Sequence, residues 1–353
     1  GCQYENGEGA RFEDSPVDRA ASDEGDRVNK RRQVVVAFGA GAFCGSRFAL
    51  AQSQGEVRRI GFLQQFNDPV RLEAFRAGLR DLGYAEGRNI IIDYQPAAGN
   101  EARMNASAAE IVSQKVDVIV ADGGTASTLA AMRATKSIPI VFPTLGDPVS
   151  QGIVKDLARP GGNVTGLSLQ STELTGKVLQ LLREIIVGVK RVAFMVNPSN
   201  LSVGPVLLQL PPLAAKLGLD IRIFEPKATS EIVPAVSEIA HGRFDALVVW
   251  NDAMLVQNSL TIASLATTQK LPTMGYHSSL PESGGLASYG PDRADLLRRA
   301  AVYVDKILKG AKPGDLPVEQ PTKFELVINV KTAKLLRIKI PQSILVQATK
   351  VID

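Results

Sequence analysis

Aromatic side chains, cysteine and histidine are scarce in this chain. Of its 353 residues, 5% are aromatic, two are histidines and two are cysteines, and both cysteines, Cys2 and Cys44, lie near the amino terminus. A protein that stacks nucleic-acid bases on aromatic rings would need more rings, and disulfide frameworks or thiolate metal sites would need more cysteines. The net charge of +4 comes without a long block of basic residues, so we predict that nucleic acid is not a partner.

Sequence motifs of catalysis are also missing. The chain has no G-x-S-x-G, no phosphate loop ending in Gly-Lys-Ser/Thr and no H-E-x-x-H, and His241 and His277 are far apart in sequence. Glycines within residues 39–45 have the spacing G-x-G-x-x-x-G, which departs from the dinucleotide-binding pattern. We therefore predict no enzymatic activity, no cofactor and no metal site. The alternative is an exported enzyme, which would need an acid/base pair such as Asp147 and His277 within hydrogen-bond reach.

The amino-terminal segment has the pattern of an export signal. Residues 30–32 are basic, residues 33–45 are uncharged and mostly apolar, and Ala49-Leu50-Ala51 forms an A-x-A site before Gln52. We predict a signal peptide over residues 28–51, cleaved near Ala51/Gln52, and a periplasmic location, with Sec and twin-arginine export both left open. Residues 1–27 carry eight acids against three arginines, and we expect an upstream extension that is disordered or not native.

From residue 57 onward, short apolar runs alternate with helical patterns. Continuous apolar runs of this length are typical of strands buried on both faces of a parallel sheet. The first set of expected strands is 58–63, 90–94, 116–121 and 138–142, with helices over 69–82, 101–113 and 125–135. The second set is 191–196, 220–224, 246–250 and 271–274, with helices over 204–217, 230–241 and 254–268. The sequence therefore predicts an α/β protein with two doubly wound parallel-sheet lobes.

Glycine-flanked segments separate the two sets and predict how the lobes are joined. We expect residues 162–170 and 284–290 to be short strands that cross between the lobes, and a third crossing near 316–324 before a short carboxy-terminal tail. Lobe 1 would then contain residues 57–165 and 288–315, and lobe 2 residues 166–287 and 316–353. Such a three-crossing hinge would give a Venus-flytrap arrangement with a cleft between the lobes.

Polar residues that follow the expected strands are the candidate ligand contacts, because ligands of doubly wound sheets bind at the carboxyl ends of the strands. Glycines 123 and 124 leave backbone N–H groups open at a helix start, which would suit an anion; an ordinary cap by Thr125 or Ser127 is the alternative. Asp252 could receive an ammonium group or cap the next helix. The predicted ligand-binding residues are Gln65, Phe66, Thr125, Ala126, Ser127, Thr144 and Asp147 in lobe 1, Asn197, Asp252, Tyr276 and His277 in lobe 2, and Tyr289 near the cleft.

Several stretches in order resemble the substrate-binding proteins of bacterial ABC transporters, in particular the tryptophan/tyrosine transport-related family. They are IGFL (60–63), FRAGL (75–79), LGY (82–84), GDPV (146–149), RPGGNVTG (159–166), GGLASYGP (284–291) and ILKGAKP (307–313). The resemblance implies a periplasmic-binding-protein type I-like fold, no catalysis, and capture of an amino acid or similar small molecule for a permease and ATPase. It also implies that Thr125, Ala126 and Ser127 bind a carboxylate, that Asp252 faces the amine, and that Phe66 and Tyr276 enclose the side chain.

The sequence as a whole thus predicts a solute-binding protein of an ABC importer. We expect a monomer that takes a small organic ligand, such as an amino acid or a related carboxylate, into the cleft between its lobes and closes about a hinge. The first alternative is a periplasmic protein that senses a ligand for a receptor. The second, the exported enzyme, rests on the acid/base pair named above.

Overall fold

The computed structural model describes residues 57–353, which fall within one compact unit of the chain. The predicted signal peptide over 28–51 and the extension over 1–27 lie outside the described residues. Within 57–353, none of the helices combines the length and the apolar character needed to span a membrane.

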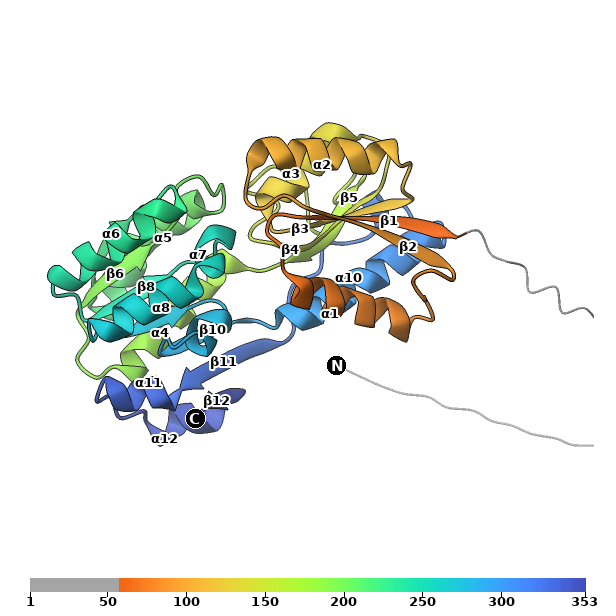
Figure 1. The fold of residues 1–353 in the computed structure, drawn as a ribbon. Helices are drawn as coiled ribbons and strands as arrows, with labels where there is room; N and C mark the ends of the chain where they lie inside the picture. The colour runs from red at the N-terminus through yellow and green to blue at the C-terminus, as the bar shows by residue number, and fades with distance from the viewer. Residues whose placement is uncertain (1–56) are drawn as a thin grey trace, which may run out of the picture. The chain divides into compact units, whose positions relative to one another are not determined.

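Lobe 1 is built on a five-stranded parallel sheet with the order β2-β1-β3-β4-β5. Its strands are β1 (Arg58–Gln64), β2 (Ile90–Pro96), β3 (Val118–Asp122), β4 (Ile140–Leu145) and β5 (Val164–Ser168), and its helices are α1 (Pro69–Asp81), α2 (Glu101–Ser113), α3 (Thr125–Ala134) and α10 (Arg293–Leu308). Every residue of β3, β4 and β5 is buried, as expected for strands covered on both faces. Figure 1 shows α1 and α10 side by side on one face of this sheet and α2 with α3 on the other.

Lobe 2 contains a seven-stranded sheet with the order β12-β11-β10-β9-β8-β6-β7. Its strands are β6 (Arg191–Met195), β7 (Asp220–Phe224), β8 (Ala246–Val249), β9 (Thr273–Gly275), β10 (Ala287–Pro291), β11 (Phe324–Asn329) and β12 (Lys350–Ile352). Its helices are α4 (Ser171–Ile185), α5 (Val203–Leu217), α6 (Thr229–His241), α7 (Ala253–Gln257), α8 (Ser259–Thr268), α9 (Ser279–Glu282), α11 (Val330–Leu335) and α12 (Gln342–Gln347). Only the β10–β11 pair within this sheet is antiparallel. The α/β class with two parallel-sheet lobes is therefore confirmed.

The segments expected to be crossing strands belong to the sheets themselves. β5 pairs with β4 in lobe 1, and β10 pairs with β9 and β11 in lobe 2. The chain crosses between the lobes just after each of these strands, at 169–171 and 291–293, and again at 320–323, between Glu319, which bonds to Gly166 in lobe 1, and β11 in lobe 2. The expected boundaries between the lobes, at 165/166 and 287/288, therefore lie a few residues too early in the chain. All of β5 belongs to lobe 1, and all of β10 belongs to lobe 2.

Two expected elements differ from the structure. The helix expected over 254–268 is two helices, because Asn258 leaves the helical backbone (φ −99°, ψ 17°) and its side-chain Nδ2 donates to the Met254 carbonyl. The carboxy-terminal segment is not a short tail: β11, α11, α12 and β12 extend the lobe 2 sheet and bury Ile344. Their short lengths and mixed polarity gave no clear periodic signal.

Helices α1 and α10 approach each other closely at Gly78. A Cβ on Gly78 would lie 2.7 Å from the Arg298 carbonyl oxygen and 2.9 Å from Ala301 Cβ. Alanine would add about 1 kcal/mol of helix propensity, but overpacking costs about 1–3 kcal/mol, and a backbone oxygen cannot rotate away. The contact with a backbone oxygen places the cost in the upper part of this range, so we expect Gly78→Ala to lower the free energy of unfolding in urea by about 1–2 kcal/mol.

The matched control for this prediction is Gly176 in the middle of α4. A Cβ there meets only Leu213 Cδ2, at an ordinary 3.6 Å. Gly176→Ala should therefore raise the free energy of unfolding by up to about 1 kcal/mol. Equal stability of Gly78→Ala and the wild type would contradict the close approach of α1 and α10.

Candidate functional site

The carboxyl ends of strands from both lobes meet at a cavity of about 690 Å³. Lobe 1 contributes the segments after β1, β3 and β4, and lobe 2 contributes those after β6, β8 and β9. Parallel strands bring their following loops to one edge of a sheet, and here the two edges face the same space. The cavity is large enough for an amino acid or a molecule of similar size.

Eight of the twelve predicted ligand contacts line this cavity. They are Gln65, Phe66, Thr125, Ala126, Thr144, Asn197, Asp252 and His277. The other four, which are Ser127, Asp147, Tyr276 and Tyr289, do not line it, and each has a partner elsewhere in the protein. Their role as ligand contacts has no support from the cavity geometry.

Local hydrogen bonds hold two of these four residues. The Ser127 hydroxyl is fully buried and donates to the Gly124 carbonyl at 3.0 Å. The Asp147 carboxylate accepts from the backbone N–H groups of Val149 and Ser150, both at 3.2 Å. Among the described residues no hydrogen bond joins Asp147 to His277, so the acid/base pair required by the enzyme alternative is not formed.

Packing inside lobe 2 holds the two tyrosines. The Tyr276 ring lies edge-on to Trp250 with 4.7 Å between ring centroids, and its hydroxyl donates to Thr175 Oγ1 at 3.2 Å. Tyr289 stacks on Phe324 at 5.9 Å between centroids. Successive residues at a strand end point to opposite faces, so His277 reaches the cavity while Tyr276 enters the core.

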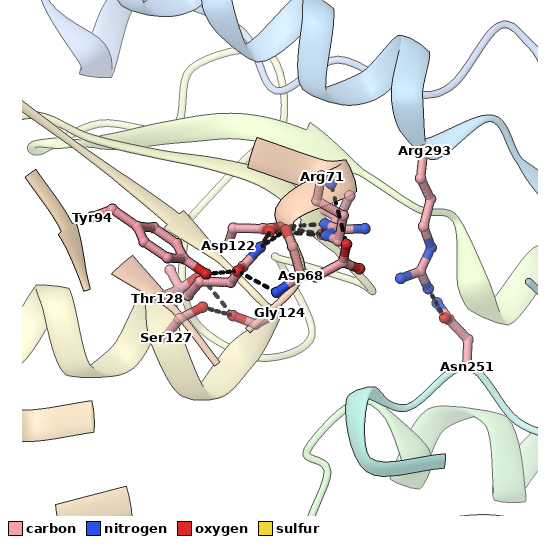
Figure 2. A network of polar contacts seen from close by, with 11 residues as sticks. Asp68, Arg71, Tyr94, Asp122, Gly124, Ser127, Thr128, Asn251 and Arg293 are labelled. Atoms are coloured by element: carbon pink, nitrogen blue, oxygen red, sulfur yellow. Dashed lines mark hydrogen bonds and ion pairs between the residues drawn. The ribbon is translucent and has the colours of Figure 1, made fainter. Parts of the chain in front are cut away.

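The amino terminus of α3 is open toward the cavity. Gly123 and Gly124 adopt positive φ angles of 119° and 85°, and no side chain caps the helix. The Thr125 hydroxyl donates to Gln151 Oε1 at 2.7 Å and Ser127 bonds to a carbonyl (Figure 2), so the alternative of an ordinary cap is not realised. First-turn N–H groups without a cap, at the positive end of the helix dipole, are suited to an anion.

Across the cavity, Asp252 caps α7. Its Oδ1 accepts from the backbone N–H groups of Met254 at 2.9 Å and Leu255 at 3.3 Å. The side-chain amides of Asn197 and Asn200 donate to Oδ1 at 3.3 Å and to Oδ2 at 2.9 Å. Oδ2 has one protein donor, so this carboxylate retains a lone pair on the cavity side while acting as a cap.

Sequence reasoning missed a buried ion pair between Arg71 on α1 and Asp122 at the end of β3 (Figure 2). Arg71 Nε donates to Asp122 Oδ2 at 2.8 Å. The Nη2 of Arg71 donates to Asp122 Oδ1 and also to Thr144 Oγ1, the latter at 3.0 Å. Gln64 adds a donor to Asp122 at 2.9 Å and is held by the Tyr94 hydroxyl at 2.6 Å. Burial by itself would raise the pKa of Asp122, but the charge and hydrogen bonds of Arg71 and the bond from Gln64 outweigh it and lower that pKa.

A second missed cation is Arg293, the first residue of α10. Its Nη2 donates to Asn251 Oδ1 in lobe 2, which makes a contact between the lobes (Figure 2). Burial, with a smaller contribution from the charge of Arg71, lowers the pKa of Arg293 to about 9. An arginine directly after a crossing segment was the available signal, because such a residue lies where both lobes and the cleft meet.

The cavity lining is electrically balanced. Its cations are Arg71, Arg133, Lys227 and Arg293, and its acids are Asp68, Glu101, Asp122 and Asp252. Four of each sign suit a zwitterionic or neutral ligand better than a strongly charged one. Among residues 57–353, no cluster of three or more histidine, cysteine or acidic side chains could hold a metal ion.

Comparison with known proteins gives a consistent picture. The family described as ABC transporter substrate binding protein matches residues 67–352. A curated tyrosine-binding protein from Clostridioides difficile is 32% identical over 282 residues, which cover 79% of this chain and 81% of that protein.

Solved structures of similar proteins point to the same family. An ABC domain from Streptococcus pneumonia in complex with L-Trp is 29% identical with a TM-score of 0.79, covering 84% of this chain and 99% of that one. A conserved domain protein from Vibrio cholerae is 33% identical with a TM-score of 0.79, covering 84% and 100%. The ligand-free, open structure of a substrate-binding protein from Clostridium difficile is 29% identical with a TM-score of 0.63, covering 84% and 99%.

Proposed function

The chain belongs to the family of ABC transporter substrate-binding proteins, and from this premise we propose that it captures an aromatic α-amino acid between its lobes for import. Proteins of this family bind small molecules outside the cytoplasm and work with transporter components. The resemblance inferred from the sequence is thereby confirmed at the level of the family. The amino-acid ligand, the periplasmic location with cleavage near Ala51/Gln52, and the monomeric state are parts of the proposal.

One observation carries the proposal: the uncapped start of α3 and the Asp252 carboxylate line the same cavity from opposite lobes. The N–H groups of Thr125 and Ala126 would receive the α-carboxylate of the ligand, and Asp252 Oδ2 would receive its ammonium group. A zwitterion bound in this way bridges the lobes and stabilises their closed arrangement.

The rest of the cavity lining suits a large apolar side chain. Phe66, Met104, Leu129, Met254 and Val256 contribute apolar surface to it, and thioethers contact aromatic rings favourably. The ligands named for two relatives, L-Trp and tyrosine, are both aromatic amino acids. We therefore favour an aromatic side chain over a small or purely aliphatic one.

Contacts between the lobes support ligand capture by closure. Gln151 of lobe 1 donates to Ser202 Oγ of lobe 2 at 2.5 Å, and Gln151 also accepts the Thr125 hydroxyl at the start of α3. At equal sequence identity, the TM-score is higher for the L-Trp-bound structure than for the ligand-free, open one. This difference supports the view that these contacts belong to the closed form.

The direct test is isothermal titration calorimetry of the protein with L-tyrosine, L-tryptophan, L-phenylalanine and L-leucine. Tyramine, which lacks the carboxylate, and 4-hydroxyphenylpropionate, which lacks the amine, would report on each end of the zwitterion. We expect saturable binding of at least one aromatic amino acid, at least about tenfold weaker binding of both truncated analogues, and no turnover. Tight binding of an analogue that lacks either group would contradict this orientation.

Asp252→Asn tests the residue assigned to the ammonium group. The amide keeps an oxygen to cap α7 but removes the charge, so the lobe should remain folded while amino-acid affinity falls about ten- to a hundredfold. Asp147→Asn is the matched control, because Asp147 also caps a turn near a strand end but does not line the cavity. Unchanged affinity in Asp252→Asn would remove Asp252 from the binding site.

A further inference from the structure

Three side chains lining the cavity offer hydrogen-bond donors to it. They come from three separate segments, with Arg71 on α1, His277 after β9 and Arg293 at the start of α10. The proposed α-amino-acid contacts at α3 and Asp252 use none of them. Each has a donor that the described protein leaves without an acceptor.

The free donor on Arg71 is Nη1. The other two guanidinium nitrogens bind Asp122 and Thr144, while Nη1 is buried and has no partner. A buried guanidinium N–H without an acceptor is costly. A group that enters the cavity beside Arg71 is therefore favoured if it brings an acceptor.

The free donor on His277 is Nε2, because its other ring nitrogen is committed as an acceptor. The backbone N–H of Ser279 can only donate, and it lies 3.0 Å from His277 Nδ1, so Nδ1 carries no proton. Burial and the nearby charges of Arg293 and Arg71 lower the pKa of His277 well below its usual range, which keeps the ring neutral. The single ring proton is then on Nε2, for which the described residues supply no acceptor.

Of the two arginines in this group, Arg293 is the one whose charge is not matched by a bonded acid. Its hydrogen-bond partner is the neutral Asn251 side chain, and within residues 57–353 no carboxylate forms an ion pair with it. Arg71, in contrast, is neutralised by Asp122. The three groups line one cavity. The nearby charges of Arg71 and Arg293 each lower the pKa of His277, and the charge of Arg71 lowers the pKa of Arg293. Figure 2 shows Arg293 reaching from α10 to Asn251.

We propose that Arg293, Arg71 Nη1 and His277 Nε2 form a second subsite that binds an acceptor at the far end of the ligand side chain. This inference rests on the proposed function, in which α3 and Asp252 hold the α-amino-acid group. The subsite selects side chains that end in an oxygen, and a carboxylate fits it best because one unmatched positive charge is present. Tyrosine, with its phenolic oxygen, fits better than phenylalanine.

The test is calorimetry with L-phenylalanine, L-tyrosine and 4-carboxy-L-phenylalanine, which differ only at the end of the ring. For the wild type we expect affinity to rise in that order, with about a ten- to hundredfold span between the first and the last. Arg293→Gln should reduce the span to within about threefold. Any loss that is common to all three ligands would come from breaking the contact with Asn251.

Two further variants distinguish the effect of the Arg293 charge from the effect of losing a cation elsewhere in the cavity or the contact between the lobes. Arg133→Gln is the matched control, because Arg133 also lines the cavity and also donates to an asparagine oxygen, at 2.8 Å from Asn105, but lies exposed; it should keep the order of affinities. Asn251→Ala breaks the same contact between the lobes as Arg293→Gln yet leaves the cation in place. It too should keep the order, even if all three affinities fall together.

Each of the remaining outcomes decides against a specific part of the inference. Equal affinities of the wild type for the three ligands would overturn the subsite and leave the proposed function intact. An equal loss for all three ligands in Arg293→Gln, with the order kept, would assign Arg293 to the α-carboxylate instead of the side chain. Absence of binding by every aromatic amino acid would overturn the proposed function and this inference together.

Discussion

Replacing Asp122 with alanine is expected to lower the free energy of unfolding by about 3–5 kcal/mol. The fully buried Asp122 carboxylate is the ion-pair partner of Arg71, whose side chain is 13% exposed. Removing the acid leaves a guanidinium in the interior with no carboxylate bonded to it, and Gln64 and Thr144 cannot replace that charge. Urea unfolding followed by circular dichroism would measure the change, and calorimetry should show weaker ligand binding because Arg71 lines the cavity.

The double variant Asp122→Asn with Arg71→Leu is the control for this prediction. Removing both charges avoids an unpaired ion, so it should regain much of the stability lost in Asp122→Ala. A double variant no more stable than Asp122→Ala would show that the lost stability reflects packing and not the unpaired charge.

The same pair predicts a dependence on pH. Because the folded-state pKa of Asp122 is lowered from its ordinary value of 3.8, ionised Asp122 stabilises the fold. This contribution is complete above the ordinary pKa and is lost as the pH falls through the lowered folded-state value. The difference in unfolding free energy between wild type and Asp122→Asn should therefore be constant at neutral pH and shrink only in strong acid.

Replacing Gly146 with alanine is expected to weaken ligand binding about ten- to a hundredfold with little effect on the fold of either lobe. Gly146 follows β4 in lobe 1, and a Cβ there would lie 2.5 Å from Oγ and 3.0 Å from Cβ of Ser202 in lobe 2. The overlap with Ser202 arises only when the lobes are together, so the methyl group disfavours the closed state by the cost of overpacking. A ligand that binds the closed state then loses affinity by the same factor.

The measurements are calorimetry for affinity and a thermal melt without ligand for stability, which should change little. Gly204→Ala is the matched control, because Gly204 lies two residues after Ser202 and a Cβ there meets nothing within 4 Å. Adding Ser202→Gly to Gly146→Ala should restore part of the affinity by removing the two atoms that the new methyl meets most closely. Wild-type affinity in Gly146→Ala alone would contradict closure at this contact.

The family, the α/β class and the two lobes could be predicted from the sequence because they depend on local patterns. Apolar runs such as those of β3 and β4 are typical of strands buried on both faces of a sheet, and the glycines at 123 and 124 indicate a helix start whose N–H groups could meet an anion. The carboxyl ends of parallel strands then predict the region of the cavity. Eight of the twelve predicted contacts line it for this reason.

The remaining features depend on contacts between residues distant in sequence, which only the tertiary structure decides. Tyr276 and His277 are neighbours, yet one enters the core and the other the cavity, because the orientation of β9 in its sheet fixes which residue faces which side. Arg71 meets Asp122, and Arg293 meets Asn251, only after the sheets have formed and the chain has crossed between the lobes. The sequence by itself thus determined the kind of protein and the edge of each sheet where a ligand would bind, whereas side-chain direction and long-range pairing, set by packing, decided which charges line the cavity.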